Sequence, residues 1–297
     1  MRRRFVTLDV FTGKRFTGNP LGAVLEPDGL DTETMQAVTR EFGHPETIFV
    51  FPPTDPKHRA RLRIFTPGRE IPFAGHPTVG AAVLFARLDG GKGAREMVIE
   101  ETIGPVRCRA EPKGPEHGSA SFTVPMQPER GGAAPDGAAI AAVLDLDAGE
   151  IGFDGLTPQR WTAGNAFTFV PLRGLDAVKR CRPDLSRFED TFGGERPGMV
   201  FVFCRETLDA DHDFHARMFA PGMGVFEDPA TGSAAAAFAG LLAADLPDGE
   251  HAYAIEQGHE MGRPSLMRLT LTMNDGKLES AAIGGEAVVV TEGTIEA

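Results

Sequence analysis

Short runs of apolar residues, many of them alternating with polar residues, recur along the whole chain of 297 residues. Residues 5–11 alternate, and residues 21–25 follow Gly18-Asn19-Pro20, so the two runs predict a β-hairpin. Further strands are predicted over residues 46–51, 59–65, 96–101, 106–110, 120–124, 166–172, 200–204, 214–219, 251–256, 265–273 and 287–291. Strands outnumber helices and most connections are short, which favours mainly antiparallel sheets over a doubly wound parallel fold.

Helical spacing is confined to a few segments. Residues 31–42 carry apolar side chains at helical spacing, with Asp31 or Thr32 as the N-cap, and residues 138–144 predict a short helix. Two further runs, residues 77–86 and 234–244, have no charge on any face. A helix that is apolar all round has to be enclosed, so each half is predicted to be a curled sheet wrapped around one central helix.

A repeated motif divides the chain. Residues 63–68 and 217–222 both read Arg-x-Phe-x-Pro-Gly, and each copy leads into a small-residue turn and one of the two apolar helices. Gly18-Asn19 and Gly164-Asn165 precede the two copies in the same order. This order predicts two similar domains, residues 1–124 plus 285–297 and residues 125–284, with the linker in the Pro- and Gly-rich residues 125–137.

The composition, with 41% hydrophobic and 24% charged residues, is typical of a soluble globular protein. A net charge of −12 argues against nucleic-acid binding, because a phosphate backbone calls for a surplus of Lys and Arg, but it is compatible with a small anionic substrate. No apolar run is long enough for a membrane span or a secretory signal. Cys108, Cys181 and Cys204 are widely separated, which predicts reduced thiols in a cytoplasmic protein.

The openings of the two apolar helices are candidate anion sites. The first turn of a helix presents backbone N–H groups without internal partners, and Gly75-His76-Pro77 and Thr231-Gly232-Ser233 suit such openings, the second with hydroxyl caps. The alternative is that both are merely well-capped core helices. The titratable residues nearby are Glu46, His76 and Asp228. Glu46 could instead be a solvated carboxylate at a strand end, and Asp228 a turn former.

These segments resemble the PhzF-like (phenazine-biosynthesis F) family, which shares its fold with diaminopimelate epimerase and proline racemase. The matching segments, which follow one another nearly from end to end, are residues 9–11, 16–20, 46–50, 75–78, 227–234 and 257–265. The resemblance implies an α+β fold of two similar domains, each a mainly antiparallel β-barrel wrapped around a central α-helix. It also implies an active site in the cleft between the domains, and a homodimer.

The resemblance carries roles over by position. Glu46 matches the glutamate that acts as general acid/base, and the other two residues expected to be catalytic are His76 and Asp228. The residues expected to bind substrate are Asn19, Gly75, Thr78, Thr231, Gly232 and Ser233. The racemase relatives carry a cysteine on each side of the cleft, where this chain has glycine or serine. A two-thiol racemisation is therefore not expected.

The function that the resemblance implies is a cofactor-independent isomerase. Glu46 would move a proton on a small carboxylic acid, as in a double-bond isomerisation, and the helix openings would stabilise the delocalised anion. No metal is expected, and no nucleotide-binding motif is present. The alternatives are an epimerase that uses a carboxylate and a histidine, and a non-catalytic small-ligand-binding protein on the same fold.

Three further sets of residues could carry other chemistry. Ser233, His76 and Asp228 contain the ingredients of a hydrolytic triad, but the chain lacks a Gly-x-Ser-x-Gly elbow. His212 and His215 are expected to lie at the surface or in a loop rather than to hold a metal. Arg263 could meet a substrate carboxylate or tie loops together, and the sequence does not decide between the two.

Overall fold

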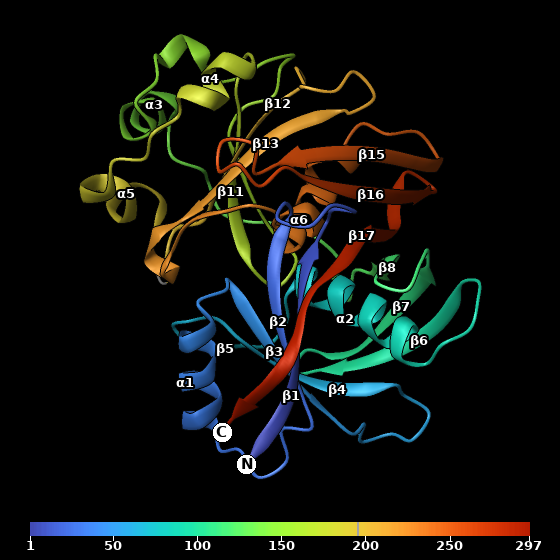
Figure 1. The fold of residues 1–297 in the computed structure, drawn as a ribbon. Coiled ribbons are helices and arrows are strands. Elements are labelled where there is room, and N and C mark those ends of the chain that lie inside the picture. The colour runs from blue at the N-terminus through green and yellow to red at the C-terminus, as the bar shows by residue number, and fades with distance from the viewer. Residues whose placement is uncertain (195) are drawn as a thin grey trace. The chain divides into compact units, whose positions relative to one another are not determined.

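The computed structural model describes residues 1–194 and 196–297. This part of the chain forms two compact units (Figure 1). Unit 1 comprises Met1–Pro125 with Ala282–Ala297, and unit 2 comprises Met126–Ala281. No helix in the described residues combines the length and the apolar composition needed to cross a membrane.

The strands of unit 1 close into a barrel. β2 pairs antiparallel with β1 and parallel with β3, and β4 pairs with β3 and with β6. β6, β7 and β8 follow as antiparallel neighbours, and β17 pairs with both β8 and β1 and so completes the ring. The bounds are β1 Arg2–Val10, β2 Asn19–Leu25, β3 Glu46–Phe51, β4 Ala60–Phe65, β5 Glu70–Ile71, β6 Arg95–Glu101, β7 Gly104–Pro112, β8 His117–Thr123 and β17 Lys277–Glu296.

The helix α2 (Gly75–Leu88) occupies the interior of this barrel. It contacts β1, β2, β3, β6, β7 and β8, and every residue from Gly75 to Ala86 is buried. Gly80 allows the closest approach, because a Cβ there would lie 2.6 Å from Cδ2 of Leu21 on β2. The small and apolar residues of this segment therefore do what their pattern predicts, which is to let the strands surround the helix.

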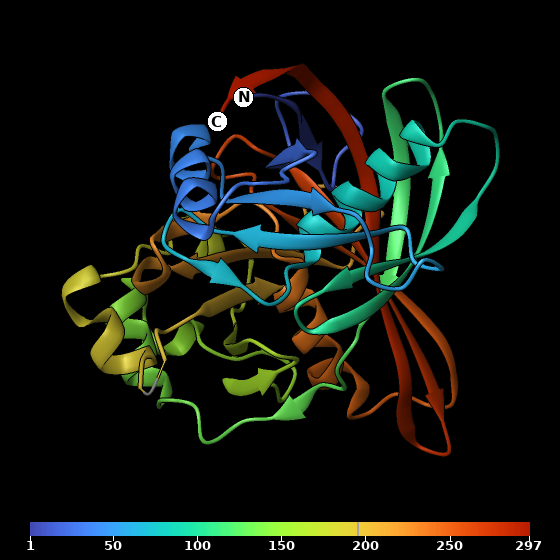
Figure 2. The same ribbon diagram turned by 90° about the horizontal axis from the view of Figure 1, so that it is seen from below.

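The helix α1 (Thr32–Phe42) lies on the outside of unit 1, beside β3 and β4 (Figure 2). Asp31 is its N-cap, with Oδ1 accepting a hydrogen bond of 2.8 Å from the backbone N–H of Thr34. Gly43 ends the helix in the left-handed conformation at φ 65. The two chain termini meet in this unit, where the Met1 amino group donates to the Ala297 carbonyl at 3.0 Å.

Unit 2 repeats the pairing pattern of unit 1. The pairs β10–β11, β11–β12, β12–β13, β13–β15 and β15–β16 alternate between antiparallel and parallel in the same order as β1–β2, β2–β3, β3–β4, β4–β6 and β6–β7. Its bounds are β9 Glu129–Arg130, β10 Gln159–Thr162, β11 Ala166–Pro171, β12 Val200–Cys204, β13 Phe214–Ala220, β14 Val225–Asp228, β15 Gly249–Gln257 and β16 Ser265–Asn274.

The central helix of unit 2 is α6 (Gly232–Ala243), which contacts β9, β10, β11 and β16. Gly240 has the role here that Gly80 has in unit 1, because a Cβ would lie 2.5 Å from Cε3 of Trp161. The predicted α+β plan, in which mainly antiparallel strands wrap around a central helix in each of two similar domains, is confirmed.

The repeated Arg-x-Phe-x-Pro-Gly motif has the same structure in both units. Arg63 on β4 pairs with Glu70 on β5 at 2.6 Å, and its guanidinium lies over the ring of Phe65. Arg217 on β13 pairs with Glu227 on β14 at 2.8 Å and lies over Phe219. In each unit the ion pair of the motif arginine thus links the long strand, β4 or β13, to the short strand, β5 or β14, that precedes the central helix.

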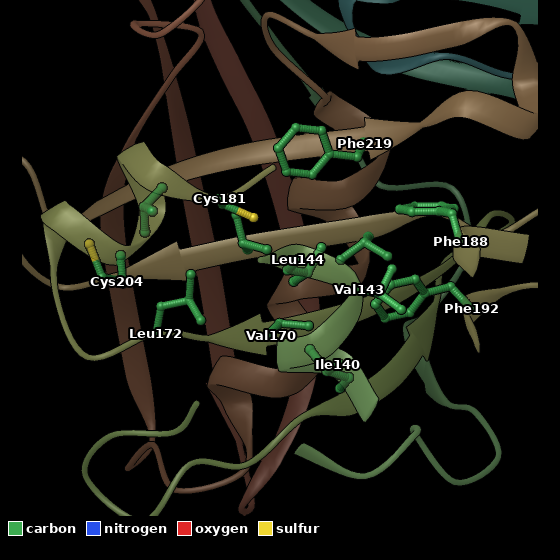
Figure 3. Packing of buried hydrophobic residues seen from close by; sticks show 14 residues of the cluster. Ile140, Val143, Leu144, Val170, Leu172, Cys181, Phe188, Phe192, Cys204 and Phe219 are labelled. Carbon is green, nitrogen blue, oxygen red and sulfur yellow. The ribbon is translucent and has the colours of Figure 1, made fainter. Parts of the chain in front are cut away.

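Unit 2 also contains a helical cluster that is larger than the outer helix α1 of unit 1. Figure 3 shows Ile140, Val143 and Leu144 of α3 (Gly137–Leu144) packed with Phe188 and Phe192 of α5 (Leu185–Phe192). The helix α4 (Leu175–Arg180) lies beside β12 and β13. The sequence analysis predicts α3 but includes neither α4 nor α5.

Candidate functional site

The predicted site residues of unit 1 gather where two parallel strands begin. Asn19 is the first residue of β2, Glu46 is the first residue of β3, and Leu21 is opposite Glu46 in the parallel pair. Because parallel strands start at the same edge of a sheet, both side chains belong to one end of the barrel. The opening of α2 at Gly75 and His76 meets them there, as the contact between His76 and Glu46 shows.

Glu46 and His76 form the central contact of this group. Oε2 of Glu46 lies 3.2 Å from Nδ1 of His76, and the exposed fractions of the two side chains are 17% and 4%. Burial lowers the pKa of His76 to about 3, even though a hydrogen bond with the Pro20 backbone raises it. The imidazole is therefore neutral near pH 7, and the structure places a carboxylate that solvent can reach beside a buried neutral ring.

The openings of α2 and α6 lack side-chain caps. The N-cap residues are Ala74 and Thr231, and neither side chain accepts a hydrogen bond from the first turn of its helix. The expectation that the hydroxyl of Thr231 caps α6 is wrong, because this hydroxyl donates instead to Oδ2 of Asp228 at 2.6 Å. The N–H groups of both first turns are left for other partners, which suits an anion.

The predicted site residues of unit 2 surround the opening of α6. Asp228 is the last residue of β14 and is buried, Gly232 begins the helix, and Ser233 is partly exposed. A residue that the prediction did not include, Gln257, holds this turn. Its Nε2 donates to the Asp228 carbonyl at 2.6 Å, and its Oε1 accepts from the N–H of Thr231 at 3.3 Å. The sequence feature that could have identified Gln257 is its position at the start of segment 257–265, which resembles the family.

Thr78, predicted to bind substrate, is fully buried on the first turns of α2. Its hydroxyl lies 2.7 Å from the Ala74 carbonyl and 2.7 Å from Oε1 of Glu101. Glu101, the last residue of β6, is the second buried polar residue that the sequence prediction missed. In the sequence, Glu101 resembles a carboxylate at the exposed end of a strand. Its burial depends on how the barrel packs around it.

The prediction for His215 is wrong. His215 lies on β13 and is fully buried, with Nδ1 2.6 Å from Oε1 of Glu256 and Nε2 3.0 Å from Oε1 of Glu260. His212 is partly buried and contacts the other oxygen of Glu256 at 2.7 Å. Both ring nitrogens of His215 thus contact carboxylates of the protein, because β13 is buried on both faces.

The three cysteines are free thiols in buried positions. Burial raises the pKa of Cys181 and of Cys204 to about 12, and it raises the pKa of Cys108 further. A thiol acts as a nucleophile or base only as a thiolate, so these groups are unreactive near neutral pH. This agrees with the expectation that two-thiol chemistry does not take place.

Comparison with known proteins places the chain in a family. The family model described as phenazine biosynthesis-like protein matches residues 8–293. The chain therefore belongs to the phenazine biosynthesis-like (PhzF) family, as the motifs around Glu46, His76 and Asp228 predict.

Individual relatives agree with this assignment. An uncharacterized isomerase of Mesorhizobium japonicum is 47% identical, over 99% of this chain and 98% of its own length. The trans-2,3-dihydro-3-hydroxyanthranilate isomerase of Pseudomonas aeruginosa is 31% identical, with 98% of each chain covered. A Bacillus anthracis crystal structure of the PhzF family superposes with a TM-score of 0.88 at 27% identity, and all of both chains is covered. The chain is accordingly an isomerase of this family.

Proposed function

We propose that this isomerase moves a proton between two carbon atoms of a small anionic carboxylic acid, without a cofactor, and that Glu46 is the general acid/base. The observation that carries the proposal is the contact between Glu46 and the buried His76 at the opening of α2. The relative from P. aeruginosa, which is named as an isomerase of an unsaturated carboxylic acid, trans-2,3-dihydro-3-hydroxyanthranilate, supports the reaction class.

The reaction needs one group that takes a proton and returns it. In the first step the Glu46 carboxylate removes a proton from carbon, and the electron pair spreads over the conjugated acid. In the second step the protonated Glu46 returns a proton to a different carbon, so that a double bond has shifted and no electrons are gained or lost. A positioned carboxylate contributes roughly 10²–10⁴-fold to such a transfer.

The neutral state of His76 affects how strongly Glu46 acts as a base in the first step. An imidazolium at 3.2 Å would stabilise the Glu46 carboxylate and make it a weaker base. A neutral ring orients the carboxylate without adding a full positive charge. Because burial keeps the pKa of His76 at about 3, the ring places no positive charge beside Glu46 near neutral pH.

The substrate anion is expected to bind at the helix openings. The first turns of α2 and α6 have N–H groups that their N-cap side chains do not use, and Asp228, Gly232 and Ser233 lie at the second opening. Whether residues of both units act on one substrate stays a prediction, which the variants Glu46→Gln and Asp228→Asn test together. If both bind the same substrate, the rate losses of the double variant are not the product of the single losses.

The test follows the exchange of carbon-bound protons by NMR in D2O. Small unsaturated carboxylic acids serve as probes, with trans-2,3-dihydro-3-hydroxyanthranilate as the first. The wild type is expected to exchange and shift protons of a probe, and Glu46→Gln to do so about 10²–10⁴-fold more slowly. Glu41→Gln, an exposed change on α1 in the same unit, is the matched control and should keep the full rate.

The same experiment separates the alternatives. An epimerase would exchange the proton and return it to the same carbon with inverted configuration. A non-catalytic binding protein would bind the probe equally well as wild type and as Glu46→Gln, with no exchange in either. A homodimer and a cytoplasmic location are also part of the proposal. The mass of the protein in solution checks the first, and fractionation of its host cells checks the second.

A further inference from the structure

The last residues of β6 and β15 occupy the same place in the two units. In the parallel pair β4–β6, Arg61 is opposite Glu100, and in the parallel pair β13–β15, His215 is opposite Glu256. The repeated motif aligns Arg63 with Arg217, and it therefore aligns these two pairs as well. The residue that follows is Glu101 in unit 1 and Gln257 in unit 2.

Gln257 forms hydrogen bonds with Thr231, the residue that precedes α6. It accepts from the backbone N–H of Thr231, the N-cap, and it donates from Nε2 to the Asp228 carbonyl and to Oγ1 of Thr231, at 2.6 and 3.1 Å. A neutral side chain with both a donor and an acceptor fits this place, because the surrounding groups include both kinds of partner.

Glu101 faces the opening of α2 in the same way. Its Oε1 is 2.7 Å from Oγ1 of Thr78, and Oγ1 is also 2.7 Å from the carbonyl of Ala74, the N-cap residue of α2. A threonine hydroxyl has a single hydrogen. Bonding of a helical threonine to the carbonyl four residues earlier is its usual arrangement, so this hydrogen points to Ala74. The short contact with Glu101 then needs a hydrogen on the carboxyl group.

The remaining oxygen of Glu101 leads to the same conclusion. Among the described residues Oε2 is buried and has no hydrogen-bond partner, and the residue as a whole is 6% exposed. An ionised carboxylate in such a place would lose its hydration without replacement. A neutral carboxylic acid, which is close in shape to the amide of Gln257, loses much less.

We propose that Glu101 is a positioning residue that acts in its protonated form, as the carboxylic-acid counterpart of Gln257. Its hydroxyl donates to Thr78, Thr78 donates to the Ala74 carbonyl, and this chain of bonds fixes the first turn of α2 on which His76 stands. The role of Glu101 in positioning His76 for catalysis rests on the proposed function. Its protonated state does not.

The charged groups on neighbouring elements do not supply a counterion. Burial keeps His76 of α2 and Cys108 of β7 neutral, by lowering the pKa of the first to about 3 and raising that of the second. On β4, Arg63 is paired with Glu70. The other cations of β4 and β7 are Arg61, which lies over the ring of Phe51, and the exposed Arg107 and Arg109. In agreement, burial raises the pKa of Glu101 to about 8, and this effect outweighs the opposite one of its contacts with the Thr78 side chain and the Ala74 backbone.

A pH titration by infrared spectroscopy tests the protonated state without any substrate. The wild type is expected to show the carbonyl band of a protonated carboxyl group at pH 6 that disappears on titration toward pH 9, and Glu101→Gln is expected to lack this band. Disappearance of the Glu101 band near pH 4.5, or its absence at pH 6, overturns the proposal.

Two variants separate positioning from mere packing. In Glu101→Leu the chain of bonds is lost, and kcat for proton exchange is expected to fall about 10²-fold through misplacement of His76, with a smaller change in KM. Glu101→Gln is expected to rescue most of this loss and to remove the fall of Tm between pH 6 and pH 9. An equal loss in both variants overturns the positioning role.

The reciprocal variant in unit 2 is the matched control. Gln257→Glu places an ionisable group at the equivalent position, so its Tm is expected to fall relative to wild type as the pH rises from 6 to 9. A Tm difference that does not change with pH argues against the equivalence of the two positions. If the infrared and Tm results hold but the wild type exchanges no protons of any probe, the proposed function fails and the protonated state of Glu101 stands.

Discussion

Nδ1 of His215 lies 2.6 Å from Oε1 of Glu256, and both side chains are fully buried in unit 2. The second ring nitrogen faces Glu260 at 3.0 Å, and Glu256 also accepts from the backbone N–H of Leu208. Burial alone would lower the pKa of His215, but the hydrogen bonds with the two carboxylates raise it. His215 is thus a buried cation between two carboxylates.

Removal of this histidine is expected to destabilise the protein strongly. His215→Ala leaves the carboxylates of Glu256 and Glu260 without their cation, and loss of one partner of a buried ion pair costs about 3–5 kcal/mol. Urea denaturation measures the change. His251→Ala on the neighbouring β15 removes only an exposed hydrogen bond to the Pro247 carbonyl, and it should cost less than about 1 kcal/mol. Equal costs for the two variants would contradict the assignment.

The same cluster predicts how stability depends on pH. Although burial would raise the pKa of Glu256, its hydrogen bonds with His215 and His212 lower it to about 2, so its contribution is present above pH 4.5 and is lost as the pH falls toward 2. His215, with its raised pKa, contributes fully below about pH 6.5 and loses its contribution as the pH rises through the raised value. The free energy of unfolding of His215→Gln should therefore differ most from that of wild type between about pH 4.5 and 6.5. A difference that does not vary with pH would contradict this.

Arg217 and Arg63 occupy equivalent positions, but the loss of Arg217 should be more costly. Besides its pairing with Glu227, Nη1 of Arg217 donates to the carbonyls of Val178 and Cys181 at the end of α4, at 3.0 and 2.8 Å. Arg217→Met leaves these buried acceptors and Glu227 unpaired, with an expected cost of about 3–5 kcal/mol.

The matched change is Arg63→Met, because Arg63 and Glu70 are the more exposed pair, with exposed fractions of 23% and 32%. Its expected cost is about 1 kcal/mol. Urea denaturation of both variants compares the two sites. A larger cost at Arg63 would show that the contacts of Arg217 with α4 contribute little.

His76 and His215 are expected to have opposite protonation states in one NMR experiment. Correlation spectra of the ring nitrogens should show His76 neutral from pH 5 to 8, since burial lowers its pKa to about 3. His215 should be an imidazolium at pH 6, because its pKa is raised. Spectra of His76→Asn and His215→Gln assign the signals. Titration of His76 near pH 6.5 would contradict the proposal that a neutral ring lies beside Glu46.

The buried thiols predict resistance to alkylation. At pH 8, iodoacetamide should leave the folded protein unmodified and its activity unchanged, because burial raises the pKa of Cys181 and of Cys204 to about 12. Unfolding in urea should make all three cysteines reactive. Rapid modification of the native protein with loss of activity would instead support a thiol-dependent reaction.

Much of the local structure could be predicted because its signals lie within a few residues of one another. Asp31 caps α1 as expected, the predicted strands 46–51 and 200–204 have the observed bounds, and the two uncharged runs are the enclosed helices α2 and α6. The parallel pairs β2–β3 and β11–β12 could not be predicted in this way. Strand partners are chosen by contacts between segments that are far apart in the sequence.

In the candidate site, too, residues within one motif could be predicted, whereas contacts between distant segments could not. The motifs identified Glu46, His76 and Asp228 as candidates, since glycine- and proline-rich turns before an apolar helix mark an opening. Gln257 and Glu101 were not among the candidates, because each reaches its helix opening only through the sheet that surrounds the helix.

The sequence by itself determined the family, the duplicated plan and the two helix openings, because these depend on motifs and on apolar spacing along one segment. Only the tertiary structure decided that His215 is a buried cation and that Glu101 carries a proton. The reason is physical. The charge of a side chain depends on its loss of water and on its hydrogen-bond partners, and for both residues these partners come from other strands and helices.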